Sequence, residues 1–492
     1  MIWNRALARC AVLAALLILS CSTSRSQASP PNAKQVVEQV ARALGAANLN
    51  SIQYSGKGFT YFYMQNYSVD GPFPKFYARY TRDVDYEKGL SRENILRSQL
   101  MSPPRGGGEQ PMYREGRRIT VASETSDWDG GAVALTPHGW VKAAMTANPE
   151  MKPARVGGKP GRIVTFSVRG KYRVEGYVNS ENLLEKVNTW VSTPILGDTL
   201  VETTFSGYRE IGGGVKFPMK IAQKLGPYTM LELEVTETRP NVPMEISLPP
   251  APPPLQVESQ KIADGVWYLA GTDKVNSQVV EFKDFVVLIE SSTSEERALA
   301  NIAEAKRLVP GKPIRYHLNS HHHGDHLAGL RAFVAEGSTI ITHEMNKRFY
   351  RQVVLKTPHT LVPDNLSRNP RPAKFIWVKD KYVLTDGDRS LEIYFVPTGH
   401  SENQIMGYLP KEGVLFVTDM LNIYVHFGEV HPNDPPAGVV SPYTAEMGQR
   451  IKQLNLDVQQ VAVSHAKQAV PAEVLWKAME GTVQVPPPAP LD

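Results

Sequence analysis

Residues 319–329 read NSHHHGDHLAG, and this stretch decides how the chain is interpreted. It holds four side chains that can bind a metal, namely His321, His323, Asp325 and His326. Imidazole and carboxylate groups together suit Zn²⁺ and other borderline divalent cations. The apolar run 313–318 (PIRYHL) is typical of a short strand, and a helix is expected from Leu327. The cluster is therefore predicted to lie in a strand-to-helix turn, where side chains converge on one point.

A run of histidines can also be a surface patch or a purification tag. Three imidazoles this close would repel one another when protonated and would gain little from packing. A tag is terminal and lacks the interleaved Gly324-Asp325. The H-x-H-x-D-H pattern is therefore interpreted as a metal site.

The composition is that of a globular protein with more than one domain. A chain of 492 residues is too long for one ordinary core. A hydrophobic content of 42% and a charged content of 21% exclude a disordered chain. The net charge of +5 is small for this length, and no dense Lys/Arg stripe with interleaved aromatic residues occurs, so no nucleic-acid partner is expected.

The N-terminus has the pattern of an export signal, predicted over residues 1–28. Arg5 and Arg9 precede the apolar run 10–19, which is too short to span a bilayer as a helix. Ile18-Leu19-Ser20-Cys21 resembles a bacterial lipobox, which predicts a periplasmic protein anchored to the membrane through a lipidated Cys21; cleavage near Ala28 would give a soluble exported protein. Because Cys10 and Cys21 are the only cysteines, no disulfide and no thiolate ligand are expected in the folded part.

Residues 30–240 are expected to form an antiparallel β-rich domain. Residues 33–47 have the apolar spacing of a helix, and Gly106-Gly107-Gly108 and Asp129-Gly130-Gly131 mark loops. Strands are predicted at 162–168, 172–178, 187–191, 199–208 and 230–238. Residues 215–220 are predicted as an edge strand, since Pro218 does not suit a central one. No set of acids, bases or nucleophiles stands out, so a binding or scaffolding role is expected.

The chain changes character after a proline-dense spacer at residues 241–256, which is predicted to be a semi-rigid linker. The second domain is expected at 257–480, followed by a flexible tail at 481–492. Its apolar runs 266–269 and 279–289 are typical of buried strands, and Ser292 with Glu295 predicts a capped helix that ends near Leu308. Strands interspersed with helices indicate an α/β layered domain.

Three more residues of ligand type follow predicted strands of this domain. They are His400 after the strand 391–396, Asp419 after the strand 414–417 and His465 after the strand 458–463. Since α/β folds gather their sites at the carboxyl ends of strands, these side chains are predicted to join the cluster.

In this order, the residues resemble the metallo-β-lactamase fold superfamily: H-x-H-x-D-H, then Gly399-His400, then an apolar strand ending in Asp419, then His465. The resemblance covers about residues 257–480 and implies a four-layer αββα domain. Residues 203–221 (TTFSGYREIGGGVKFPMKI) resemble the sheet repeats of bacterial lipoprotein-carrier-like half-barrels. The expected fold is thus a two-domain one, α+β and α/β, with the β-rich domain first.

Position by position, the resemblance implies two metal sites. His321, His323 and His400 would hold the first metal, Asp325, His326 and His465 the second, and Asp419 would bridge both. Two Zn²⁺ ions per chain are expected, with Fe or Mn as alternatives. Asp325 would also be catalytic, because it would orient the nucleophile. His322 has no ligand role in the pattern, whereas His426 and His431 lie in the loop after Asp419 and could touch substrate.

The implied function is that of an exported hydrolase of a small molecule. Two metals held there would lower the pKa of a shared water toward about 7 and so would supply a hydroxide for attack on an electrophilic carbonyl. The expected substrate is an ester, a thioester, a lactone or, as a secondary class, a β-lactam. Asp419 favours the first three, because true β-lactamases of the superfamily generally lack a bridging aspartate.

Two alternatives stay open. A mono-iron persulfide dioxygenase shares much of the ligand set, and an envelope-binding lipoprotein would have a metallo-domain without catalysis. The flavo-diiron branch is disfavoured, since it usually has a glutamate where His323 stands. Metal content separates the alternatives: two zinc ions favour the hydrolase, one iron the dioxygenase and no metal the binding protein. The sequence does not indicate the oligomeric state or the identity of the substrate.

Overall fold

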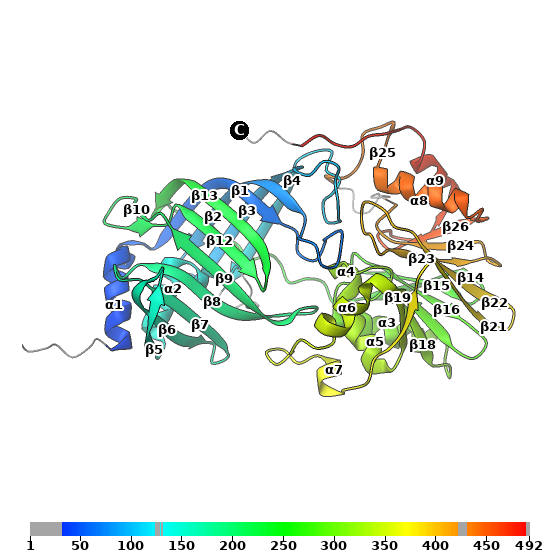
Figure 1. Cartoon of the computed structure of the whole chain (residues 1–492), viewed down its shortest axis with the longest axis horizontal. Helices are drawn as coiled ribbons and strands as arrows, with labels where there is room; N and C mark the ends of the chain where they lie inside the picture. Colours follow the sequence, from blue (N-terminus) through cyan, green and yellow to red (C-terminus); the bar gives the residue numbers. More distant parts are fainter. Residues whose placement is uncertain (1–31, 124–127, 129–130, 422–430, 489–492) are drawn as a thin grey trace, which may run out of the picture.

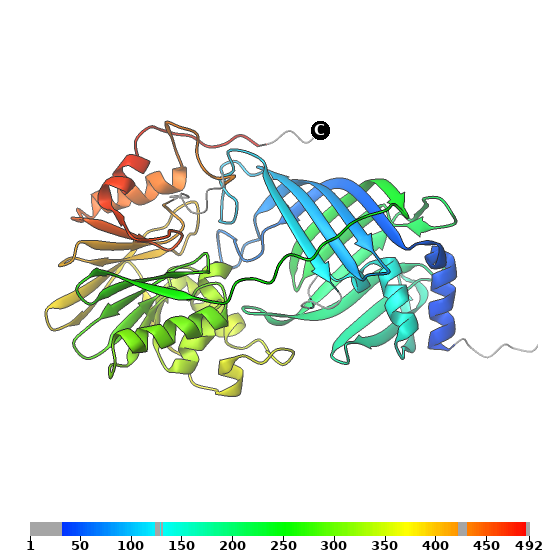
Figure 2. The ribbon, with the colours of Figure 1, turned by 180° about the vertical axis from the view of Figure 1, so that it is seen from behind.

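The computed structural model describes residues 32–123, 128, 131–421 and 431–488 of the chain. The predicted signal peptide with Cys21 lies outside these residues, and so does His426. Figure 1 shows a β-rich N-terminal half, coloured blue to green, beside a layered C-terminal half, coloured green to red; Figure 2 shows the same halves from behind. No helix in the described ranges is long and apolar enough to cross a membrane.

An eleven-stranded sheet forms the N-terminal half, with the strand order β4-β3-β2-β1-β13-β12-β9-β8-β7-β6-β5. Its strands are β1 (Ser51–Tyr61), β2 (Lys75–Asp85), β3 (Leu90–Ser98), β4 (Gly116–Ser123), β5 (Glu150–Val156), β6 (Lys159–Val168), β7 (Tyr172–Val178), β8 (Leu184–Thr193), β9 (Gly197–Ser206), β12 (Lys220–Leu225) and β13 (Tyr228–Pro240). Neighbouring strands pair antiparallel throughout, and the pairing of β1 with β13 joins the first four strands to the rest. The predicted antiparallel β-rich region is confirmed.

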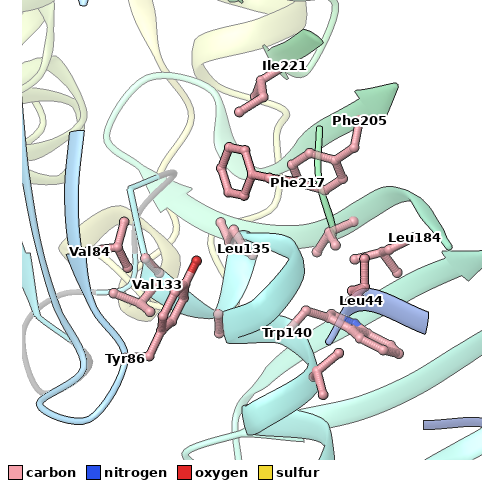
Figure 3. Packing of buried hydrophobic residues seen from close by; sticks show 14 of the residues in the cluster. Leu44, Val84, Tyr86, Val133, Leu135, Trp140, Leu184, Phe205, Phe217 and Ile221 are labelled. Atoms are coloured by element: carbon pink, nitrogen blue, oxygen red, sulfur yellow. The ribbon is translucent and has the colours of Figure 1, made fainter. Parts of the chain in front are cut away.

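Two helices close the core of this half. α1 (Ala33–Leu44) begins at a capping box on Asn32 and buries one apolar face, as its spacing predicts. α2 (Pro137–Thr146) places Trp140 in the core near Leu44 and Leu184 (Figure 3). The indole covers Gly176 of β7, where an added Cβ would lie 2.3 Å from the ring. Two 3₁₀ turns, η1 (Ala46–Asn48) and η2 (Val133–Leu135), complete this region.

The edge strand predicted at residues 215–220 is shorter than predicted and lies outside the large sheet. β11 (Lys216–Phe217) pairs only with β10 (Arg209–Glu210), in a separate two-stranded sheet. The chain leaves that ladder at Pro218, which has no N–H to donate. β12 then begins at Lys220 and lies between β9 and β13, in the interior of the large sheet.

Two sheets form the centre of the C-terminal half. The first has the order β14-β15-β16-β17-β18-β19-β20 and the second β21-β22-β23-β24-β26-β27. The strands of the first are β14 (Val257–Ala263), β15 (Val266–Gly271), β16 (Ser277–Glu281), β17 (Val286–Ile289), β18 (Ile314–Leu318), β19 (Thr339–His343) and β20 (Lys374–Val378). Those of the second are β21 (Lys381–Asp386), β22 (Arg389–Phe395), β23 (Ile405–Leu409), β24 (Val414–Val417), β26 (Gln460–Val463) and β27 (Val470–Pro471).

Buried side chains fill three interfaces between four layers. One apolar cluster lies between the two sheets and includes Val287, Ile393 and Phe416. A second packs the first sheet against α3 (Glu295–Leu308) and α5 (Leu330–Glu336). A third packs the second sheet against α8 (Pro442–Gln453) and α9 (Ala472–Ala478). This order of helix, sheet, sheet and helix is the predicted αββα arrangement.

The predicted start of α3 is wrong by two residues. Ser294 is the N-cap, and its hydroxyl accepts a hydrogen bond from the backbone N–H of Arg297. Ser292 instead has a φ of 65° and accepts a hydrogen bond from the side chain of Asn301. The remaining short elements are α4 (Gly324–Leu327), η3 (Glu344–Asn346), α6 (Lys347–Phe349), η4 (Tyr350–Val354), α7 (Asn365–Arg368), β25 (Val439–Val440) and β28 (Thr482–Val483).

Candidate metal centre

The predicted site residues meet where strands of both sheets end. After β18 the chain runs through His321 and His323 into α4, which starts at Gly324 rather than at the predicted Leu327. Asp325 and His326 therefore lie in the first turn of a helix. The other three residues follow strands of the second sheet: His400 after β22, Asp419 after β24 and His465 after β26.

The seven side chains form two groups, each able to hold one cation. His321, His323, His400 and Asp419 make the first group, and Asp325, His326, Asp419 and His465 the second. In each group, one nitrogen or oxygen atom per residue lies within 4.8 Å of the others.

Asp419 belongs to both groups because its two oxygens point to different histidines. Oδ2 lies 2.8 Å from His400 Nε2 and 3.3 Å from His321 Nε2. Oδ1 lies 3.0 Å from His326 Nε2 and also contacts His465 Nε2. A carboxylate placed between two sets of imidazoles is consistent with a site for two metal ions.

Most of these histidines have one ring nitrogen engaged outside the centre, which leaves the other for a cation. The outer contacts are Ser320 Oγ for His321 Nδ1 (2.8 Å), Glu290 Oε2 for His326 Nδ1 (2.9 Å) and the Lys274 carbonyl for His465 Nδ1 (3.1 Å). Such outer partners fix the tautomer and the ring orientation of a metal-binding histidine.

In His323 the roles of the two ring nitrogens are exchanged relative to the other three histidines. Its Nε2 donates to the Asn66 carbonyl at 2.9 Å, while its Nδ1 is buried and has no hydrogen-bond partner among the described residues. A buried ring nitrogen without a partner is costly unless a cation binds there. The donor set therefore fits a metal ion.

Two carboxylates dominate the electrostatics of the centre. Burial opposes ionisation of Asp419, but the facing His326, His465 and His400 outweigh it and hold the pKa of Asp419 well below its usual range. Burial likewise opposes protonation of His465, but Asp419 and Asp325 raise the pKa of this imidazole to about 10. The carboxylates thus attract positive charge to this point, and protons compete with metal ions for it.

Two loops of the N-terminal half lie on this centre: residues 62–74 between β1 and β2, and residues 99–115 between β3 and β4. Gln65 Nε2 donates to Asp325 Oδ1 at 2.7 Å, and the N–H of Gly324 donates to the Met64 carbonyl at 2.8 Å. Figure 1 shows the darker blue loop after β1 reaching the C-terminal half beside α4. The prediction that this half has only a binding or scaffolding role did not anticipate these contacts; the Gly106-Gly107-Gly108 run marked a loop but not its partners.

A cavity of about 470 Å³ opens onto Asp325, His400, Asp419 and His465. Both halves line it, with apolar walls from Phe62, Tyr63, Pro194, Ile195, Val275 and Ala328 and polar groups from Lys274, Thr293, His431 and Asn433. His431 therefore lies where the sequence analysis placed it. His322 is engaged elsewhere, since its Nδ1 lies against the amide of Asn403.

Glu290 is the residue of this centre that sequence analysis missed most plainly. It follows β17, is buried, and has a φ of 71°. Its carboxylate lies behind His326, as the carboxylate partner of a metal-binding histidine does. Like Asp419, Glu290 is an acidic residue just beyond the end of a buried apolar strand, and this pattern was the signal in the sequence that could have identified it.

Parts of the chain are similar to known proteins. A 76-residue segment is 30% identical to the alkyl/aryl-sulfatase BDS1 of Saccharomyces cerevisiae, covering 15% of this chain and 12% of that protein. The metallo-beta-lactamase from Pontibacter korlensis is 19% identical over 46% of this chain and 97% of its own, with a TM-score of 0.35. A metallo-beta-lactamase from Hirschia baltica is 21% identical over 45% and 96%, with a TM-score of 0.33.

A profile of the metallo-beta-lactamase superfamily matches residues 270–465, a range that contains all seven clustered side chains. This part of the chain is therefore a metallo-β-lactamase superfamily domain with two groups of His and Asp metal ligands, and an N-terminal antiparallel β-rich region precedes it.

Proposed function

We propose that this chain is a hydrolase that binds two Zn²⁺ ions and cleaves the carbonyl of an ester, a thioester or a lactone. The observation that carries the proposal is the position of Asp419, whose two oxygens face separate histidine groups at the wall of an open cavity. Bound metals supply Lewis acidity and lower the pKa of a water molecule. His321, His323 and His400 would hold one ion, Asp325, His326 and His465 the other, and Asp419 both.

The chain itself orients the reactants. Asp325 lines the cavity, and its Oδ2 lies 3.5 Å from both His326 Nε2 and His465 Nε2. From there the carboxylate can accept a hydrogen bond from the attacking water and point it toward a carbonyl in the cavity. Apolar walls such as Phe62, Ile195 and Val275 bind the body of the substrate and exclude bulk water. Substrates with an apolar body are therefore favoured, and β-lactams are the less favoured class.

Hydrolysis of a sulfate ester is the second candidate. The 76-residue similarity to a protein named alkyl/aryl-sulfatase points to it. An alkyl sulfate has an apolar chain and an anionic head, and the same cavity is lined by apolar side chains and by Lys274. The two candidates differ in the bond cleaved, so a substrate panel separates them.

The test is a panel of chromogenic esters, thioesters, lactones, β-lactams and aryl sulfates, run with and without a chelator. Turnover of a carbonyl substrate that stops with the chelator and returns with zinc supports the proposal. His323→Ala is expected to lose that turnover. His343→Ala is the matched control, because His343 bonds to the Lys379 carbonyl and stacks on Phe395 outside the two metal groups. Full activity of His323→Ala would contradict the proposal. In the purified wild-type protein, one bound iron would favour the dioxygenase, and the absence of bound metal would favour the binding protein.

We also propose that the protein is exported to the periplasm and carries a lipid anchor on Cys21. This location rests on the charged and apolar pattern of residues 1–28. The proposed substrate is a small molecule, and no nucleic-acid partner is proposed. Mass spectrometry of the mature protein from the membrane fraction tests it. A diacylglyceryl-modified Cys21 is the expected N-terminus, and an unprocessed Met1 would contradict export.

A further inference from the structure

Gln65 of the N-terminal half is held at both ends of its side chain. Its Nε2 donates to Asp325 Oδ1 at 2.7 Å, and its Oε1 accepts the backbone N–H of Gly108 at 2.6 Å. Its backbone carbonyl accepts the N–H of Gly107 at 2.9 Å, which ties the two loops together. The residue is 6% exposed, so water does not compete effectively for these bonds.

Because of the hydrogen bond from Gln65, the two carboxylate oxygens of Asp325 have different contacts. Oδ1 is occupied by the amide, whereas Oδ2 lies 3.5 Å from His326 Nε2 and from His465 Nε2, within the second metal group. The carboxylate is therefore fixed with one oxygen toward the second cation. Without the amide, it would be free to rotate and to present either oxygen or both.

The backbone around Gln65 fits closely over the first metal group as well. The Asn66 carbonyl orients His323, whose other ring nitrogen faces the cluster. Gly107 packs so tightly here that an added Cβ would lie 2.6 Å from His400 Cε1 and 2.8 Å from His323 Cε1. These contacts come from the two loops that join β1 to β2 and β3 to β4, which are neighbouring strands of the eleven-stranded sheet.

We propose that Gln65 is a positioning residue for the second metal, and that the N-terminal sheet is a working part of the catalytic unit rather than a separate binding module. This inference rests on the proposed function, since it assigns a role toward the metals of that same site. Removal of an outer partner of a metal ligand typically weakens metal affinity by about 10- to 100-fold.

Binding of Co²⁺ alone to the metal-free full-length chain tests the proposal. Gln65→Met keeps the length and volume of the side chain but removes the donor and the acceptor. The second Co²⁺ is expected to bind this variant about 10- to 100-fold more weakly, with an altered visible absorption band for that ion and unchanged affinity for the first ion. Gln53→Met is the matched control. Gln53 lies on β1 and makes the same amide-to-carboxylate bond, to Asp83 at 2.8 Å, outside the two metal groups.

The outcomes separate this inference from the proposed function. A wild-type chain that binds no Co²⁺ overturns both. A wild-type chain that binds two ions, with Gln65→Met giving the same two affinities and the same spectrum, overturns the role of Gln65 alone. If thermal unfolding shows no folded state for Gln65→Met, Gln65→Asn replaces it. The side chain of asparagine is one methylene shorter, so its amide lies farther from Asp325. The same selective loss is expected, and unaltered binding of the second ion would again overturn the role.

Discussion

Glu290 Oε2 lies 2.9 Å from His326 Nδ1, and both side chains are buried behind the metal centre. The opposite nitrogen of the same ring, Nε2, lies 3.0 Å from Asp419 Oδ1. One imidazole thus connects a buried carboxylate to the carboxylate shared by both metal groups. Such a partner raises the basicity of the histidine and strengthens its bond to a cation.

Glu290→Gln is therefore expected to weaken zinc binding by about 10- to 100-fold, because it keeps a hydrogen-bonding group behind His326 but removes the negative charge. Competition with a chromogenic chelator measures the affinity. Glu281→Gln is the control, since Glu281 pairs with Lys312 at the partly exposed end of β16. Equal zinc affinities for Glu290→Gln and the wild type would contradict the assigned role.

Gly107→Ala is expected to disrupt both loops and ligands. The new Cβ would lie 2.2 Å from Gln65 Oε1 and 2.6 Å from His400 Cε1, closer than packed atoms approach. We expect loss of at least one bound zinc and a fall in turnover of about 100-fold, since an error of about 1 Å in a site costs about that much.

The control for this variant is Gly71→Ala in the neighbouring loop, where the nearest atom to an added Cβ is the Ser68 carbonyl oxygen at 3.2 Å. Elemental analysis of the purified variants gives the zinc content. A Gly107→Ala protein with two zinc ions and wild-type turnover would show that the loop yields without moving the ligands.

Metal removal is expected to lower thermal stability as well as activity. Ligands that bind only the folded state stabilise it by about 4 kcal/mol at a thousandfold excess over Kd. Calorimetry of the chelated protein, before and after zinc is restored, measures the change in Tm. His323→Ala provides the check, because its Tm should respond less to zinc than that of the wild type. An identical rise in Tm in both proteins would place the stabilising zinc elsewhere.

Acid is expected to destabilise the N-terminal half through His138, the one histidine before residue 257. Burial lowers its pKa to about 4, although its Nε2 lies 3.2 Å from the Leu44 carbonyl. The unfolded chain, with a pKa near 6.5, then binds the proton more tightly than the folded one. The stabilisation is complete above pH 6.5 and is lost as the pH falls toward 4, by up to about 3 kcal/mol.

Urea unfolding at pH 7.5, 5.5 and 4.5, compared between the wild type and His138→Gln, isolates this effect. The variant should be less stable at pH 7.5 but lose less stability on acidification, since glutamine does not titrate. Parallel pH dependences in the two proteins would rule out His138 as the acid-sensitive group.

Residue type and strand order in the sequence determined the layered domain and the set of seven clustered side chains. These features follow from local patterns: an apolar run sets a buried strand, and a polar residue directly after it is delivered to the edge of the sheet. Local patterns did not predict the correct helix start where two neighbouring residues were equally suited to be the N-cap. Either Ser292 or Ser294 can cap a helix, and only the contact of Ser292 with Asn301 in the packed core excludes the first.

The tertiary structure alone decided that the N-terminal half belongs to the metal centre. Gln65 and Asp325 are 260 residues apart, and Asn66 and His323 are 257 residues apart. Contacts over such distances depend on how two cores pack against each other, and no periodicity within either half records that packing. The chemistry of a side chain is a property of the sequence, whereas its hydrogen-bond partner across a domain interface exists only once both halves have folded.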